Sequence, residues 1–258
     1  MLKKNFKLAL FITFLGIIGV ISIMPYQFTF IKGMVDQLGD IPIPVVLALG
    51  VVQSTILVFI LTNIALLVHK RTGLDAPHLR AWVNKTEQKP FSWKWVGIGI
   101  LVSFFGSLLV FVLDSFVFLP QIDTTGIEQS PKPLWWQSLL AMFYGGITEE
   151  IMVRLFLMTI IVWILAKMTR KEGKSIPPIY FWIGILLSTL LFGVGHLPAT
   201  IQLFGELTPI LLLRALVLNG ILGVWFGYLY WKKGLEYAMI SHMAADVFLH
   251  VIFANLFT

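Results

Sequence analysis

The sequence contains no cysteine and little charge. Its 258 residues include 13 acidic and 19 basic side chains, so only 12% are charged, about half the fraction of a soluble domain. Without cysteine, a disulfide framework and a cysteine nucleophile are both excluded. Apolar residues, in contrast, make up 58% of the chain, with 21 Phe, 9 Trp and 21 Gly. This composition excludes disordered, collagen-like and coiled-coil proteins and is typical of a protein that crosses a membrane several times.

Seven apolar runs are long enough to cross a bilayer, which takes about 20 residues. They cover 6–24, 43–68, 95–119, 134–168, 178–197, 208–231 and 235–257. No small-residue cleavage site follows the first run, so we expect it to stay as a span. The fourth run contains Gly145-Gly146 and is too long for one straight crossing, so we expect it to bend or to begin at the interface. The predicted fold class is all-α, a polytopic transmembrane helix bundle of about seven spans.

The basic residues gather on one side of these spans. Fifteen of the 19 Lys and Arg residues lie in the N-terminal segment and in alternate segments after it, whereas the opposite segments hold only Lys32 and Lys132. By the positive-inside rule the N-terminus is cytoplasmic and the C-terminus is outside. This placement explains the net charge of +6 without a nucleic-acid partner. We expect a multi-pass protein of a bacterial plasma membrane.

No loop is long enough for a soluble catalytic domain; the longest, 69–94, is mostly basic. We therefore expect a single integral membrane domain over 1–258, with any chemistry inside the bilayer or at its edge. Residues 1–133 hold three spans without a motif, and residues 134–258 hold the spans that carry the candidate site.

Ionisable side chains lie inside the spans, where each costs about 2.5–3.5 kcal/mol at mid-bilayer. They are Glu149, Glu150, Arg154, His196, Arg214, His242 and Asp246. Glu150 and Arg154 are four residues apart and can pair on one helix face. Glu149 lies roughly 100° around the helix from Glu150 and is left for chemistry. For Arg214 we expect either snorkelling to the outer interface or an acidic partner.

Other polar residues are expected to have structural roles. His69, His78 and His250 fall in a loop or near a helix end. Ser241 lacks the strand-turn-helix context of a nucleophile. A Glu, two His and an Asp on three separate spans, in contrast, indicate one shared polar cavity.

Such a cavity suits hydrolysis of an acyl bond. A carboxylate and a histidine can deprotonate water, and a second histidine with an acidic neighbour can stabilise an oxyanion. Glu149, His196 and His242 would equally make a zinc site with one open position, although the sequence has no His-Glu-x-x-His motif. The same residue types can also relay protons in a transporter.

The motifs resemble those of a known family. Glu149-Glu150-x-x-x-Arg154, Phe192-x-x-x-His196 and His242-x-x-x-Asp246 follow in this order on successive spans. Together they resemble the CPBP family, the CAAX-processing and bacteriocin-processing intramembrane endopeptidases also called Abi proteins. The resemblance covers about residues 144–248.

The resemblance implies roles for these positions. Glu149 would be the catalytic base and would activate water together with His196, while His242 and Asp246 would stabilise the oxyanion. The supporting positions would be Glu150, Arg154 and Phe192. The CAAX-processing branch typically has Asn where this chain has Asp246, and an ionised Asp is a poor oxyanion donor. Asp246 would therefore be protonated, or would orient His242 instead.

The resemblance also implies partners. The substrate would be a peptide or a lipidated protein C-terminus presented from the bilayer, cleaved without a cofactor, with zinc as the alternative. Two other functions stay open: a non-catalytic membrane protein that binds a peptide or confers bacteriocin immunity, and, less favoured, a proton-coupled transporter. A transporter would be expected to show inverted repeats, and the sequence has none that we detect.

Depth in the membrane poses one difficulty. At about 1.5 Å per residue, Glu149 and His196 lie some 27 Å from the cytoplasmic ends of their runs, whereas His242 lies about 13 Å from its own. These side chains can meet only if the fourth and fifth helices are offset along the membrane normal or strongly tilted.

Overall fold

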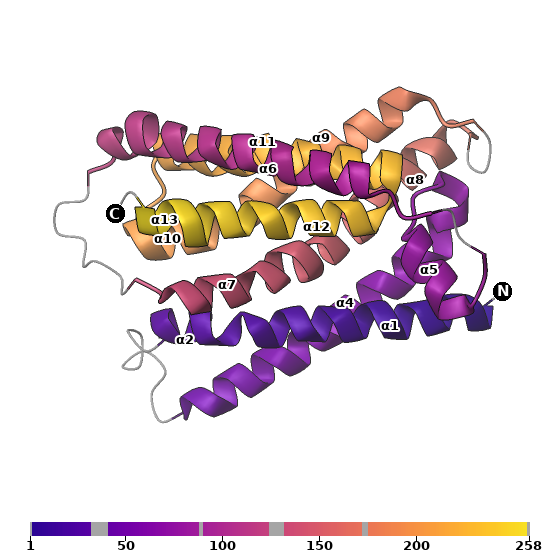
Figure 1. Ribbon diagram of the computed structural model, residues 1–258, viewed down its shortest axis with the longest axis horizontal. Helices are drawn as coiled ribbons and strands as arrows, with labels where there is room; N and C mark the ends of the chain where they lie inside the picture. Colours follow the sequence, from indigo (N-terminus) through magenta and orange to yellow (C-terminus); the bar gives the residue numbers. More distant parts are fainter. Residues whose placement is uncertain (1, 32–40, 88–89, 124–131, 172–174, 257–258) are drawn as a thin grey trace.

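The computed structural model describes residues 2–31, 41–87, 90–123, 132–171 and 175–256, and these ranges contain helices and no strand (Figure 1). The α-helices are α1 Leu2–Ser22, α2 Met24–Ile31, α4 Ile43–Thr72, α5 Pro77–Asn84, α6 Trp93–Leu113, α7 Trp135–Phe143, α8 Thr159–Met168, α9 Pro178–Gly195, α10 Leu197–Phe204, α11 Pro209–Lys233, α12 Leu235–Asp246 and α13 Ala254–Leu256. The π-helical segments are η2 Asp114–Phe118, η4 Tyr144–Glu149, η5 Ile151–Met158 and η6 Val247–Phe253, and η3 Leu119–Gln121 is a 3₁₀ turn.

Within the described residues, seven helical stretches are long and apolar enough to span a membrane. They are Asn5–Phe30, Ile43–Thr72, Trp93–Gln121, Trp135–Met168, Pro178–Phe204, Pro209–Lys233 and Leu235–Leu256. The predicted all-α bundle of about seven spans is thus confirmed, and each predicted run overlaps one stretch. The orientation stays a prediction, and several residues of the charge count, including Lys32, Lys89 and Lys174, lie outside the described residues.

The fourth stretch, for which the sequence predicted a bend or a start at the interface, contains a long π-helical region. The whole stretch is helical without a break, from α7 through η4 and η5 into α8. π-Helical turns are rare and often mark functional sites. Here they begin at Tyr144, immediately before Gly145-Gly146, and include Glu149 and Arg154.

The loop 69–94 carries a short helix that is tied to the bundle. Within α5, Arg80 forms an ion pair with Asp75, at 2.5 Å and 2.7 Å, and donates to Asn5 of α1 at 2.7 Å. The backbone N–H of Leu79 donates to the Glu236 carboxylate of α12 at 2.8 Å. α5 is therefore fixed beside α1 at the end of the molecule where the chain begins (Figure 1).

Arg214 has an acidic partner inside the bundle. Its guanidinium donates to both Asp114 oxygens at 2.6 Å, and it also lies over the ring of Phe204. Of the two explanations expected from the sequence, the one with an acidic partner is confirmed. This ion pair joins α11 to η2. Pairing lowers the free-energy cost of placing the two charges inside the bundle.

α12 lies at the centre of the packing around the site. It contacts α6 and α11 on its sides and α7 and η4 across the site, while α1 packs against α4 and η4. The Ser103 hydroxyl of α6 donates to the carbonyl of Ser241 at 2.6 Å, and the Ser107 hydroxyl donates to that of Ala245 at 3.3 Å. The spans without motifs therefore brace the spans that carry them.

Cysteine labelling can test the orientation, because the chain has no native cysteine. Thr86 and Glu206 are exposed and belong to loops predicted on opposite sides. In intact cells, a membrane-impermeant maleimide should label a Glu206→Cys variant and spare a Thr86→Cys variant. Permeabilised cells should show both labelled. The reverse pattern in intact cells would contradict the predicted orientation.

Candidate active site

Glu149, His196, His242 and Asp246 come together at one place in the bundle. The Oε1 atom of Glu149 lies 4.0 Å from Nε2 of His196, and its Oε2 atom lies 3.8 Å from Nε2 of His242. The Nε2 atom of His242 is also 3.7 Å from Oδ1 of Asp246. Three helical spans thus supply one polar cluster, as the motif spacing predicted.

His242 is held in place from two sides. Its Nδ1 atom lies 2.9 Å from Oε1 of Glu150, and its ring stacks on that of Phe226 with centroids 4.5 Å apart and planes at 17°. An ionised carboxylate only accepts, so Nδ1 is the donor of this bond. The other nitrogen, Nε2, is therefore directed at Glu149 and Asp246.

Glu150 also pairs with Arg154, as the i, i+4 spacing predicted. The Oε2 atom of Glu150 is 3.5 Å from Nε of Arg154, and both side chains are 1% exposed. Arg154 Nη2 donates to the carbonyl of Gly223 in α11 at 3.0 Å, and its guanidinium lies over the Phe192 ring. A chain of polar contacts therefore runs from α11 through Arg154 and Glu150 to His242.

His196 lies at the end of α9 and is more accessible than its partners. Its Nδ1 atom is 2.9 Å from the carbonyl oxygen of Phe192, and the two rings meet edge to face at 4.5 Å. Because a carbonyl only accepts, Nδ1 carries the proton. The His196 side chain is 38% exposed, compared with 16% for Glu149 and 8% for His242.

Two glycines, which the motif analysis missed as site residues, allow this close packing. A Cβ atom on Gly145 would overlap the Asp246 carboxylate and lie 3.2 Å from Nε2 of His242. A Cβ atom on Gly146 would overlap the Met243 side chain and lie 2.9 Å from the carbonyl of Met239. The Gly145-Gly146 pair therefore lets η4 approach α12 at the site.

The depth difficulty disappears because the helices are offset. In Figure 1, α9 begins further toward the end of the molecule where α1 begins than α12 does. His196 at the end of α9 therefore reaches the level of His242, which lies in the second half of the shorter helix α12.

The other polar residues are distributed as follows. Ser241 faces α6 and hydrogen-bonds Ser103, Trp225 and the carbonyl of Gly99, away from the cluster. His69 bonds the carbonyl of Leu66, and His78 packs edge to face against the rings of Phe91 and Tyr237. His250 of η6, however, lies one turn after Asp246 and within electrostatic range of His196 and His242. The only sequence signal for this placement is the spacing of four residues that relates His242, Asp246 and His250.

A cavity of about 490 Å³ is lined by Tyr144 and Ala199, which lie close in the chain to Glu149 and His196, but by none of the four cluster residues themselves. Its walls come from the ends of α1 and α2, the first half of α4, η4 and α10, and its polar lining residues are Tyr26, Gln27, Ser54, Tyr144 and Gln202. Tyr144 begins the π-helical segment that ends at Glu149, and Tyr26 interacts electrostatically with Asp246. The volume suits a segment of peptide or of lipid chain.

Across the described part of the chain, no group of three or more His, Cys, Asp or Glu side chains is arranged to hold a metal ion. Glu149, His196 and His242 are the side chains that come closest to forming such a set.

The fold and site define a multi-pass helical membrane protein with a buried, hydrolase-like polar cluster. Residues 131–248 match the family model of the Rce1-like type II CAAX prenyl endopeptidases. This match is consistent with a CPBP family intramembrane protease, and it confirms the resemblance inferred from the three motifs. No curated protein and no solved structure matches the chain.

Gly145 provides a test of the packing at the site. A Gly145→Ala variant should push η4 away from Asp246 and His242, and a shift of about 1 Å at a catalytic centre can cost about 100-fold in rate. The matched control is Gly220→Ala, because a Cβ atom there meets nothing within 4 Å. Cleavage of a peptide substrate by purified protein is the measurement, and equal rates in the two variants would contradict the close approach.

Glu150 provides a test of the buried ion pair. A Glu150→Ala variant leaves Arg154 without its anion and His242 without its acceptor, so the free energy of unfolding should fall by about 3–5 kcal/mol. Denaturant unfolding in detergent measures this loss. The control is Glu206→Gln, at an exposed carboxylate. Wild-type stability in Glu150→Ala would show that the pair does not hold the helices together.

Proposed function

We propose that the protein is an intramembrane endopeptidase in which Glu149 and His196 activate water to hydrolyse a peptide bond of a membrane-associated protein or peptide. The observation that carries this proposal is the meeting of Glu149 with His196 and His242, from three spans, at 4.0 Å and 3.8 Å. The Rce1-like domain supports protease activity in general.

The first step uses the gap between Glu149 and His196. One water can bridge two acceptors that lie 4.0 Å apart, since each hydrogen bond is about 2.8 Å long. The neutral His196 ring, protonated at Nδ1, offers the Nε2 lone pair to this water. Glu149 takes one proton as the water oxygen attacks the carbonyl carbon.

The second step stabilises and then collapses the tetrahedral intermediate. In this step His242 would be an imidazolium, protonated on both ring nitrogens: its Nδ1–H is bonded to Glu150 and its Nε2–H would donate to the oxyanion. A protonated Asp246 would be a second donor. The C–N bond then breaks, and the leaving amine takes the proton held by Glu149. Arg154 and Glu150 support this arrangement from behind, while Phe192 shapes the pocket.

The cavity at Tyr26 and Tyr144 would receive the substrate. Its walls belong to the end of the bundle away from most of the basic residues, because α2, the first half of α4 and α10 all lie there (Figure 1). With the orientation predicted from charge, substrate would therefore enter from the outer half of the bilayer. Its mixed lining suits an extended peptide with apolar or lipidated ends.

Cleavage by purified protein tests the proposal. Wild type should cleave at least one member of a panel of prenylated and unprenylated C-terminal peptides and leader-type peptides. Glu149→Gln, His196→Ala and His242→Ala should each lose about 100- to 10,000-fold in rate while remaining inserted. Glu206→Gln is the matched carboxylate control.

The remaining outcomes separate the alternatives. Activity that survives a strong chelator supports the metal-free mechanism, and loss restored by zinc would move Glu149, His196 and His242 into a metal shell. Full activity in any of the three variants would overturn the assignment. Peptide binding without cleavage would favour the binding or immunity protein, and proton-coupled flux in sealed vesicles would favour the transporter.

A further inference from the structure

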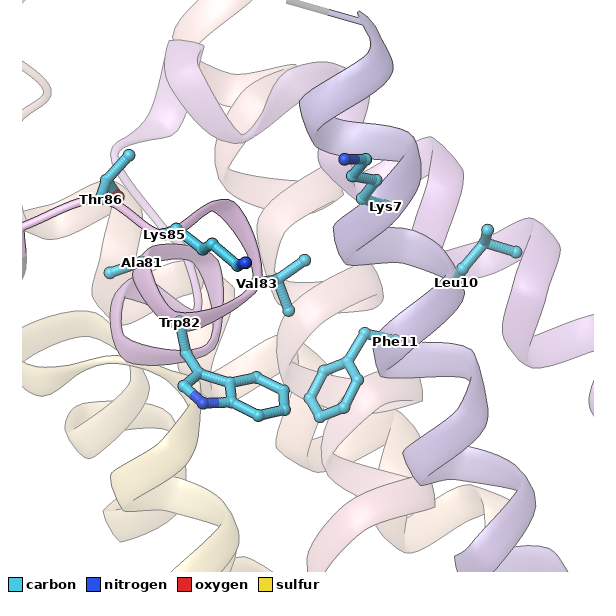
Figure 2. Close-up of a pocket in the computed structure, with 8 residues that line it drawn as sticks. All are labelled: Lys7, Leu10, Phe11, Ala81, Trp82, Val83, Lys85 and Thr86. Carbon is cyan, nitrogen blue, oxygen red and sulfur yellow. The ribbon is translucent and has the colours of Figure 1, made fainter.

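A second recess lies at the opposite end of the molecule, between α1 and α5. It has a volume of about 860 Å³ and is lined by Lys7, Leu10 and Phe11 of α1 and by residues 81–83, Lys85 and Thr86 in and after α5. We call this recess the α1–α5 groove (Figure 2). It shares no lining residue with the cavity beside the candidate active site.

Two cations face each other across the groove. Figure 2 shows the side chains of Lys7 and Lys85 directed from α1 and α5 into the space between the helices. Among the described residues, no ion pair involves Lys7 or Lys85. Asp75, the acidic residue that precedes α5, is paired with Arg80. Two unpaired ammonium groups aimed at one space favour an anionic ligand with more than one oxygen, such as a phosphate diester.

The backbone holds Lys85 in this position. Lys85 ends α5 in the left-handed conformation, with φ 52°, and its N–H bonds the carbonyl of Trp82 at 3.3 Å. This conformation is uncommon for residues other than Gly, Asn and Asp and costs about 1–2 kcal/mol.

The floor of the groove is aromatic and opens onto the outer surface of α1. The rings of Phe11 and Trp82 lie with centroids 4.8 Å apart, and Trp82 is 64% exposed. Phe14 and Ile18, three and seven residues after Phe11, are also exposed and extend this apolar face along the span. A phosphate between the lysines would therefore have an apolar track for an acyl chain directly beside it.

We propose that the α1–α5 groove binds an anionic phospholipid, with its phosphate between Lys7 and Lys85 and an acyl chain along Phe11, Trp82 and α1. Basic recesses beside spans are suited to anionic lipid head groups, and tryptophan is favoured at the membrane interface. A soluble anion would not use the apolar track. The site is independent of the proposed cleavage reaction.

Lipid binding to the purified full chain tests this proposal by native mass spectrometry. Phosphatidylglycerol should bind wild type more tightly than phosphatidylcholine, and a Lys7→Gln/Lys85→Gln variant should bind phosphatidylglycerol roughly 10- to 30-fold more weakly. A Lys70→Gln/Lys171→Gln variant removes the same charge from exposed lysines outside the groove and should bind like wild type.

Further arms keep the result decisive. A Lys7→Arg/Lys85→Arg variant should retain binding. If the Lys7→Gln/Lys85→Gln variant does not fold, this Arg variant is compared with Lys70→Gln/Lys171→Gln in its place. Inorganic phosphate that competes fully with the lipid would overturn the role of the acyl track. Equal affinity for the two lipids, equal weakening in both Gln variants, or preferential capture of an acidic peptide would overturn the proposal.

Discussion

The organisation of this protein depends on how it neutralises charge in an apolar core. Arg154 is fully buried, and a lone cation there would be very costly. Arg154 is paired with the Glu150 carboxylate of the same helical stretch and donates a hydrogen bond to a carbonyl of α11. Glu150 then uses its second oxygen to fix His242. The same carboxylate that neutralises Arg154 therefore sets the direction of His242 in the polar cluster, so the burial of the arginine and the orientation of the histidine depend on one group.

Close packing between η4 and α12 is the second condition. Glu149 and Asp246 lie on different spans, and only a helix pair without intervening Cβ atoms brings both near His242. Gly145 and Gly146 meet this requirement, and the π-helical turns that follow them present Glu149 and Glu150 to different neighbours. On the far side, α6 binds carbonyls of α12 through serine hydroxyls. The reactive cluster is thus held between elements that are themselves fixed.

The fold and the cluster were largely predictable, for identifiable reasons. Bilayer thickness sets the length of each span, so seven apolar runs sufficed to predict the bundle, and the i, i+4 spacing of Glu150 with Arg154 predicted their pair. Other features depend on contacts between distant spans. Neither the stacking of Phe226 on His242 nor the bond from Arg154 to the carbonyl of Gly223 has any local pattern. The identity of the acidic partner of Arg214 could not be predicted either, because Asp114 lies one hundred residues earlier in the chain.

The N-terminal spans show why motifs alone understate a site. α1 carries none of the reactive residues, yet the carbonyl of Gly16 accepts the Thr148 hydroxyl of η4 at 3.1 Å, and a Cβ atom on Gly19 would overlap that same threonine. Its later residues form part of the cavity wall, and its start forms one side of the α1–α5 groove. α1 therefore contributes a hydrogen-bond acceptor, a surface that permits close packing at Gly19, and a regular helix with a rise of about 1.5 Å per residue. None of these depends on a distinctive side chain, so a helix without a motif can still determine the geometry of the polar cluster.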